Sequence, residues 1–155
     1  MRVTILAVGR LRGGPERELL DDFLSRFDRT GRPLGLGPAA VVEVEARPSA
    51  GKAAEGALLL GKLPKDAWTC ALDERGEAMT SPDFARLLDR WKLERREAVF
   101  AIGGADGLDG SVTARADLLL SFGRMVWPHM LARVMLSEQL YRAATILSGG
   151  PYHRA

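Results

Sequence analysis

The sequence predicts an α/β fold with a mainly parallel sheet flanked by helices. Short strand-like runs alternate with helix-like segments along the whole chain, a pattern typical of parallel sheets. The length of 155 residues and the hydrophobic content of 46% suffice for one buried core. Because no linker or internal repeat divides the chain, we expect a single domain over residues 1–155.

The first half of the chain is expected to hold three strands and two helices. A β-rich run ends at Gly9, and Pro15 then fits the first turn of a helix whose apolar residues recur at helical spacing. The glycine-rich stretch 31–38 is a loop by composition, and Pro64 ends the second helix. The expected elements are strands at 3–8, 41–45 and 68–72, a helix from Pro15, and a helix over about 49–63.

The second half repeats the alternation. Ser81 is the expected N-cap of a helix, because Pro82 follows it at the first helical position. Residues 98–102 are continuously apolar, which predicts a central strand buried on both faces. After the loop 103–110 we expect a strand at 118–121 and a last helix from near Pro128 to about Leu147.

Composition excludes several classes of protein. A single cysteine, Cys70, excludes a disulfide framework and a four-cysteine zinc site, and two histidines are too few for a closed zinc site. The longest apolar run is far too short to span a bilayer, and no leader peptide is recognisable. We therefore expect a cytoplasmic protein that binds neither metal nor membrane.

The net charge of +2 does not by itself indicate a nucleic-acid-binding protein. Both ends of the chain are mildly basic and the middle is acidic, so a weak basic patch that contacts RNA phosphates is permitted. An ordinary solvated surface explains the same charges.

The loop 103–110 is the strongest local signal for a ligand site. Ligands of open α/β sheets bind at the carboxyl ends of strands, and four of these eight residues are glycine, which lets backbone approach a ligand closely. The loop matches neither the dinucleotide fingerprint nor a P-loop. Since Asp106 and Asp109 would repel phosphates, the loop suits a neutral or cationic ligand. The alternative is a tight turn that binds nothing.

Two C-terminal segments have unusual composition. The connector 122–129 is apolar, so it is either buried or lines an apolar pocket. The last helix is apolar on two sides, which predicts burial between the protomers of a homodimer.

Polar residues at the C-terminus form a second candidate site. Glu138 and Arg142 are spaced i,i+4, either as an ordinary solvated pair or as an interface pair that orients a substrate. Tyr152, His153 and Arg154 can stack bases, exchange protons and pair with phosphates. A frayed terminus is the alternative for these three residues.

The order and spacing of five short motifs resemble one family over the full chain. The motifs are 72–76 (LDERG), 100–108 (FAIGGADGL), 125–129 (MVWPH), 138–143 (EQLYRA) and 151–154 (PYHR), and the opening 7–11 (AVGRL) fits as well. The family is ribosomal RNA large-subunit methyltransferase H, of the SPOUT superfamily.

The resemblance implies a fold whose C-terminal part forms a deep trefoil knot, and a homodimer as the working unit. It implies transfer of a methyl group from S-adenosyl-L-methionine to N3 of a pseudouridine in the helix 69 loop of 23S rRNA, with the assembled ribosome as substrate. The residues that it assigns to the cofactor are Leu72, Gly103, Gly107, Phe122, Gly123, Arg124, Met125, Val126 and Trp127.

The resemblance also assigns the RNA-facing and catalytic residues. These are Glu138, Arg142, Tyr152, His153 and Arg154, acting partly across the dimer interface. His153 is the first candidate for taking the N3 proton, because a neutral imidazole predominates at pH 7. Arg142 is the second candidate, acting by stabilising the deprotonated base.

Two residues depart from the family pattern. Val126 stands where threonine is frequent, and Met130 stands where glutamine is frequent. A catalytically inactive RNA-binding homodimer of the same fold is therefore retained as an alternative. A Rossmann-like nucleotide-binding enzyme is disfavoured because the glycine fingerprint is missing.

Overall fold

The computed structural model describes residues 1–154, so Ala155 lies outside the described residues. The strands are β1 (Arg2–Val8), β2 (Ala39–Val44), β3 (Trp68–Ala78), β4 (Glu97–Ile102) and β5 (Leu118–Ser121). The helices are α1 (Pro15–Gly31), the short 3₁₀ helix η1 (Arg32–Leu34), α2 (Gly51–Leu60), α3 (Ser81–Glu94), α4 (Gly110–Arg115) and α5 (His129–Ser148).

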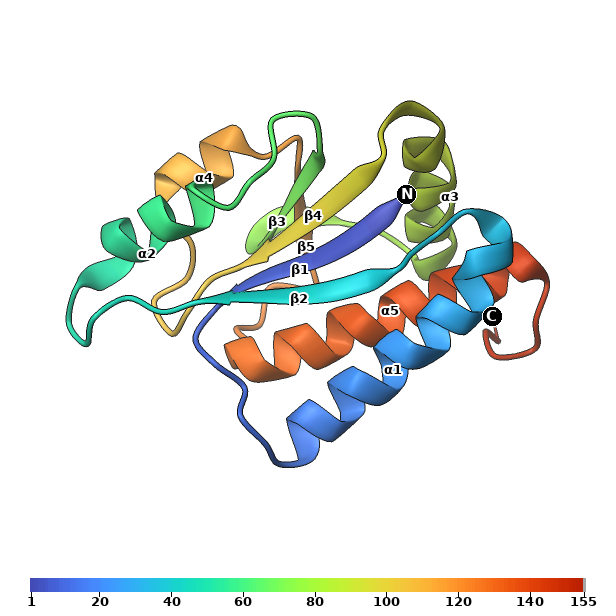
Figure 1. The fold of residues 1–155 in the computed structure, drawn as a ribbon, viewed down its shortest axis with the longest axis horizontal. Coiled ribbons are helices and arrows are strands. Elements are labelled where there is room, and N and C mark those ends of the chain that lie inside the picture. The colour runs from blue at the N-terminus through green and yellow to red at the C-terminus, as the bar shows by residue number, and fades with distance from the viewer. Residues whose placement is uncertain (155) are drawn as a thin grey trace.

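The five strands form one parallel sheet in the order β2-β1-β4-β3-β5. Helices cover both faces: α1, α3 and α5 pack on one, and α2 and α4 pack on the other (Figure 1). The prediction of an α/β fold with a parallel sheet is therefore confirmed, with β4 at the centre as expected. The trefoil knot stays a prediction.

Alternation along the central strands builds the two cores. On β4, Phe100 and Ile102 face the core beneath α1, α3 and α5, whereas Val99 and Ala101 face the smaller core beneath α2 and α4. All four are buried, which explains why this strand is apolar without interruption.

Strand β3 is longer than the sequence predicted. Residues 73–76 belong to an irregularity within it, because Leu72 and Glu77 both pair with Leu120 of β5. A Cβ on Gly76 would lie 2.6 Å from the carbonyl carbon and oxygen of Leu119, so a glycine is needed where the two backbones meet. The turn expected after the strand therefore lies inside it.

Local details differ from the sequence predictions at other positions. The N-cap of α3 is Thr80 rather than Ser81: its side chain accepts a hydrogen bond from the Asp83 amide at 3.2 Å. The short helix α4 was not predicted, although Asp109 caps it by accepting from the Ser111 amide. None of the helices within residues 1–154 is long and apolar enough to cross a membrane.

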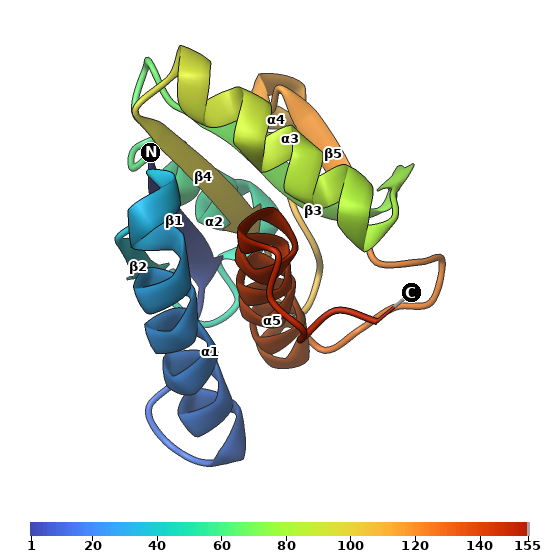
Figure 2. The same cartoon turned by 90° about the vertical axis from the view of Figure 1, so that its right-hand side faces the viewer.

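Helix α5 finds partners for most of its apolar surface within its own chain. Leu136, Leu140 and Ala143 are buried in the large core, and Tyr141 packs against Phe23 of α1 with ring centroids 6.4 Å apart. Figure 2 shows α1 and α3 on either side of α5. The two apolar sides of this helix therefore do not by themselves require a second protomer.

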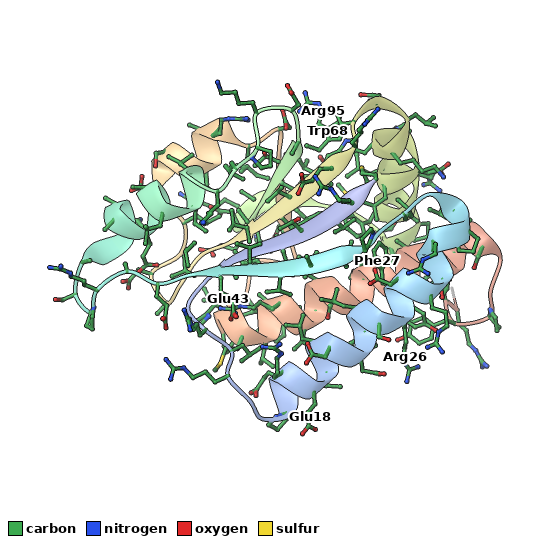
Figure 3. All side chains as sticks on the ribbon, viewed as in Figure 1. Glu18, Arg26, Phe27, Glu43, Trp68 and Arg95 are labelled. Atoms are coloured by element: carbon green, nitrogen blue, oxygen red, sulfur yellow. The ribbon has the colours of Figure 1, made fainter. Side chains whose placement is uncertain are left out.

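A buried guanidinium joins α5 to the ends of β1 and β2. Arg133 is fully buried, and its Nη2 donates to the carbonyl oxygens of Val8 at 2.6 Å and Gly9 at 2.8 Å. Its Nη1 donates to the carboxylate of Glu43 at 2.9 Å, at the position labelled in Figure 3. The same carboxylate oxygen accepts from the amide of Leu11 at 2.6 Å. One ion pair thus connects three segments that are distant in sequence.

We predict that Arg133→Met destabilises the protein by about 3 kcal/mol, because it removes the cation that pairs with the Glu43 carboxylate and the donor to two buried carbonyls. Urea unfolding measures this free energy. The exposed pair between Arg10 and Glu45 provides the control, since Arg10→Met should change stability by less than about 1 kcal/mol. Equal effects of the two substitutions would contradict this account of Arg133.

Candidate active site

A cleft of about 430 Å³ opens at the carboxyl ends of β3, β4 and β5. Its walls come from residues 72–75, the loop 102–108 and the connector after β5, with Lys52 at its edge. The parallel topology explains this convergence, because the strand ends of neighbouring parallel strands lie at one edge of a sheet. Segments far apart in sequence therefore form one concave site.

The cleft collects nearly all residues expected to bind a cofactor. The lining includes Leu72, Gly103, Gly107, Phe122, Gly123, Met125, Val126 and Trp127. Arg124 does not contribute to it and is exposed to solvent. The apolar connector 122–129 was expected either to be buried or to line an apolar pocket. The structure shows that it lines the cleft.

The glycine loop is closed by its own backbone. The Gly107 amide donates to the Gly104 carbonyl at 3.0 Å, and Gly107 has a φ of +80°. A Cβ on Gly103 would lie 2.5 Å from the carbonyl carbon and oxygen of Gly107. Gly103 is therefore required for closing the loop, in addition to any approach by a ligand.

The charges around the cleft are mostly acidic. The carboxylate of Asp73 accepts from the backbone and side chain of Arg75 at 2.8 to 3.0 Å, and these bonds lower the pKa of Asp73. Glu74 and Asp106 are exposed at the rim, with Lys52 as the remaining cation of the lining. This distribution suits a cationic or neutral ligand better than a polyphosphate.

The C-terminal segment folds back onto α5 and is ordered by polar contacts (Figure 2). Glu138 Oε1 accepts from Arg142 Nε at 3.0 Å and from the Tyr152 hydroxyl at 3.0 Å. Arg142 Nη1 lies 3.2 Å from His153 Nδ1. Four of the five residues expected to face RNA thus form one cluster, here called the tail cluster (Glu138, Arg142, Tyr152, His153), whereas Arg154 is exposed.

The contact with Arg142 determines the tautomer of His153. A guanidinium can only donate hydrogen bonds, so Nδ1 accepts and the proton of the neutral ring resides on Nε2. The bonds to Glu138 raise the pKa of Arg142, which stays charged. Burial, followed by the carboxylate of Glu138, raises the pKa of Tyr152.

Aromatic contacts extend the tail cluster toward α1. The ring centroids of Tyr152 and Tyr141 lie 4.6 Å apart, and the Arg142 guanidinium lies 4.8 Å from the Tyr152 centroid. On the other side, the guanidinium of Arg26 lies 5.9 Å from the Tyr141 centroid, and Arg26 is labelled on α1 in Figure 3. Two rings between two cations form a surface of the kind that stacks nucleobases.

An apolar groove of about 580 Å³ connects the two candidate sites. It shares Leu120, Phe122 and Gly123 with the cleft and reaches Glu138 of the tail cluster. Tyr152 and His153 themselves do not line the cleft of their own chain. Within residues 1–154, no group of three or more His, Cys, Asp or Glu side chains is arranged to hold a metal ion.

Comparison with known proteins identifies the family. A family model described as "Predicted SPOUT methyltransferase" matches residues 1–153. Proteins of Ruegeria pomeroyi and Dinoroseobacter shibae, both named ribosomal RNA large subunit methyltransferase H, are each 64% identical over 155 residues and align over 99% of both chains. This chain belongs to the ribosomal RNA large subunit methyltransferase H family.

A known structure agrees with the fold of this methyltransferase. The probable methylase family protein of Haemophilus influenzae Rd KW20 superposes with a TM-score of 0.53 at 11% identity, covering 99% of this chain and 70% of the other. The family model supports the SPOUT assignment expected from the motifs, and the superposition shows that the overall fold is shared.

The two departures from the pattern of the methyltransferase family lie on the surface. Val126 is 79% exposed and Met130 is 37% exposed. Neither side chain contributes to the core, so both differences leave the fold intact. Together with Met125, Trp127 and Leu131 they make up a set of exposed apolar residues at the cleft, here called the rim patch (125–127, 130, 131), of which residues 125–127 also line the cleft.

Sequence reasoning gave His129 no role in this methyltransferase, yet its side chain lines the cleft. Its Nδ1 lies 3.5 Å from Nη2 of Arg133. Burial, followed by the charge of Arg133, lowers the pKa of His129. The signal available in the sequence was the i,i+4 spacing of a histidine and an arginine at the start of the last helix.

We predict that Gly103→Ala lowers the free energy of unfolding by about 1–3 kcal/mol, because the new Cβ overlaps the Gly107 backbone. The affinity for S-adenosylmethionine, measured by calorimetry, should fall as well. Gly110→Ala is the matched control, since nothing lies within 4 Å of a Cβ at that position. A folded Gly103→Ala variant with unchanged affinity would remove this loop from the site.

Proposed function

We propose that this chain is an S-adenosylmethionine-dependent methyltransferase that modifies N3 of a pseudouridine in the helix 69 loop of 23S rRNA on the assembled ribosome. The observation that carries the proposal is the convergence of the expected cofactor residues on one cleft at the strand ends. Membership in a family whose relatives are named ribosomal RNA large subunit methyltransferase H supports the substrate class.

The cleft fits the proposed cofactor in size and chemistry. A volume of about 430 Å³ lies within the range of small-molecule sites. Leu72, Leu120 and Phe122 offer apolar contacts for an adenine ring, and backbone of the closed glycine loop offers hydrogen bonds. The acidic rim suits a sulfonium cation. When bound, S-adenosylmethionine supplies an electrophilic methyl group.

The tail cluster supplies the groups for holding the target nucleotide. The adjacent, tilted rings of Tyr141 and Tyr152 offer an aromatic surface for a base, and the exposed Arg154 can pair with a phosphate. Such positioning of the acceptor nitrogen lowers the barrier by removing orientational freedom before the reaction.

Loss of the N3 proton to solvent leaves negative charge on the base, and the cluster supports Arg142 as the residue that stabilises this charge. Its guanidinium is held by Glu138 and remains charged. Because Nδ1 of His153 faces the Arg142 guanidinium, the other ring nitrogen, Nε2, carries the proton and acts as a donor. A role of His153 as general base would first require the opposite tautomer, with a proton turned toward the guanidinium.

Mass spectrometry of helix 69 tests the proposed function. A strain that lacks this gene should lose the mass of one methyl group on the pseudouridine, and complementation should restore it. An unchanged modification pattern in the deletion strain would contradict the proposal. Restoration of ribosome binding without methylation would instead indicate the inactive RNA-binding homodimer.

We predict different kinetic effects for the two candidate residues. Arg142→Met should lower the single-turnover rate at saturating ribosomes by about 100- to 1,000-fold. His153→Gln preserves a donor and should mainly weaken ribosome binding, with a rate loss below about tenfold. If His153→Gln lost 100-fold or more and its rate no longer fell as the pH dropped from 7 to 6, His153 would be the base.

We also propose that the chain acts as a homodimer with the rim patch in its interface. Trp127 is 43% exposed and Met125 is 75% exposed beside the cleft, an exposure that a second protomer would cover. Such an arrangement would place the cleft of one protomer near the surface of the other.

Light scattering at micromolar concentration should therefore give about twice the chain mass of 16.9 kDa. Trp127→Glu should shift the distribution toward the monomer by placing a charge in the patch. A monodisperse wild-type species near the chain mass would contradict the homodimer.

A further inference from the structure

We propose that His129 is a cofactor-binding residue, whose Nε2–H is a fixed and uncharged hydrogen-bond donor to an oxygen of the bound cofactor. The inference rests on the proposed function, because it assumes that S-adenosylmethionine occupies the cleft at the strand ends. It adds a polar contact on a wall that is otherwise apolar.

The position of His129 directs its ring into the site. It is the first residue of α5 and directly follows the connector that lines the cleft. The residues before and after it in the lining are Trp127 and Ala132. His129 is half-buried and belongs to the lining of the cleft.

The guanidinium of Arg133 determines which nitrogen of His129 carries the proton. Arg133 Nη2 lies 3.5 Å from Nδ1 of His129 and carries positive charge, while its two N–H bonds go to the carbonyls of Val8 and Gly9. A proton on Nδ1 would point at this cation, so Nδ1 keeps its lone pair and Nε2 carries the proton. The remaining nitrogen is therefore a donor.

Arg133 is held beside the ring, because it is fully buried and both of its terminal nitrogens have hydrogen-bond partners. Its Nη2 donates to the carbonyls of Val8 and Gly9, and its Nη1 is paired with Glu43. The cation beside His129 also disfavours a second positive charge, in agreement with its lowered pKa. The donor is consequently both oriented and neutral at pH 7.

Besides His129, the side-chain donors of the lining are Lys52 at its edge, the indole N–H of Trp127 and Arg75. The lining contains the acceptors Asp73, Glu74 and Asp106, and the guanidinium of Arg75 is bound to Asp73. S-adenosylmethionine has acceptor oxygens on its ribose and on its carboxylate, and an imidazole N–H can donate a hydrogen bond to either. The experiment below distinguishes these two oxygens.

Calorimetry with S-adenosylhomocysteine at pH 7.5 tests the proposal on the wild type, His129→Leu and His129→Gln. The leucine variant should bind about 3- to 10-fold more weakly, since it lacks the donor. The glutamine variant, whose side-chain amide supplies an N–H, should stay within about threefold of the wild type. Thermal unfolding of each variant checks that the fold is retained.

A second ligand locates the contact. Methylthioadenosine has the ribose but lacks the carboxylate. If His129→Leu weakens the binding of both ligands, the contact is to the ribose. If it weakens only the binding of S-adenosylhomocysteine, the contact is to the carboxylate. Equal affinities of the wild type and the leucine variant, or equal losses in both variants, would overturn the proposal. Failure of the wild type to bind either ligand would contradict the proposed function instead.

The tautomer can be observed without any ligand. Nitrogen-15 NMR of the imidazole side chains should show His129 with a protonated Nε2 and an unprotonated Nδ1, a signal assigned by its loss in His129→Gln. The opposite tautomer would overturn the inference even if the leucine variant were too unstable to study.

Discussion

The ion pair between Arg133 and Glu43 is the constraint on which the candidate site depends. Burial of a guanidinium is costly, and here the cost is offset by a carboxylate and two backbone carbonyls at 2.6 to 2.9 Å. These acceptors lie at the ends of β1 and β2, whereas Arg133 belongs to the second turn of α5. The pair therefore sets the position at which α5 begins, and with it the connector that lines the cleft. Hydrophobic replacement of both Arg133 and Glu43 could stabilise the core equally well, but it would not specify this register.

Close backbone approaches form the rest of the site. Gly103 meets the backbone of Gly107, and Gly76 meets the backbone of Leu119, each at a distance that excludes a Cβ. The first contact closes the loop after β4, and the second holds the irregular part of β3 against β5 next to the cleft. The candidate cofactor site is thus defined by main chain and small residues, whereas the candidate RNA site is defined by charged and aromatic side chains. The main-chain site suits the proposed cofactor, which has no phosphates, and the charged site suits the proposed RNA substrate, which has many.

Much of this arrangement could be predicted from the sequence, because hydrophobic period and turn residues are local signals. The continuous apolar run 98–102 indicated the central strand, and Pro15 marked the start of α1. The irregularity in β3 could not be predicted, since it depends on how β5 pairs with Leu72 and Glu77. Similarly, the sequence showed two apolar sides on α5, but only the packed structure shows that α1 and α3 cover most of them. Contacts between distant residues, such as Arg133 with Val8, leave no local pattern.

The central claim is that the cleft between Leu72, the Gly103 loop and the connector 122–127 binds S-adenosylmethionine. A crystal structure of the full chain with S-adenosylhomocysteine tests it most directly. The account predicts density for the ligand in this cleft, with its adenine against the apolar wall and its sulfur on the side of the groove that leads to Glu138. Density confined to the groove between α3 and α5, or to another surface, would contradict the account.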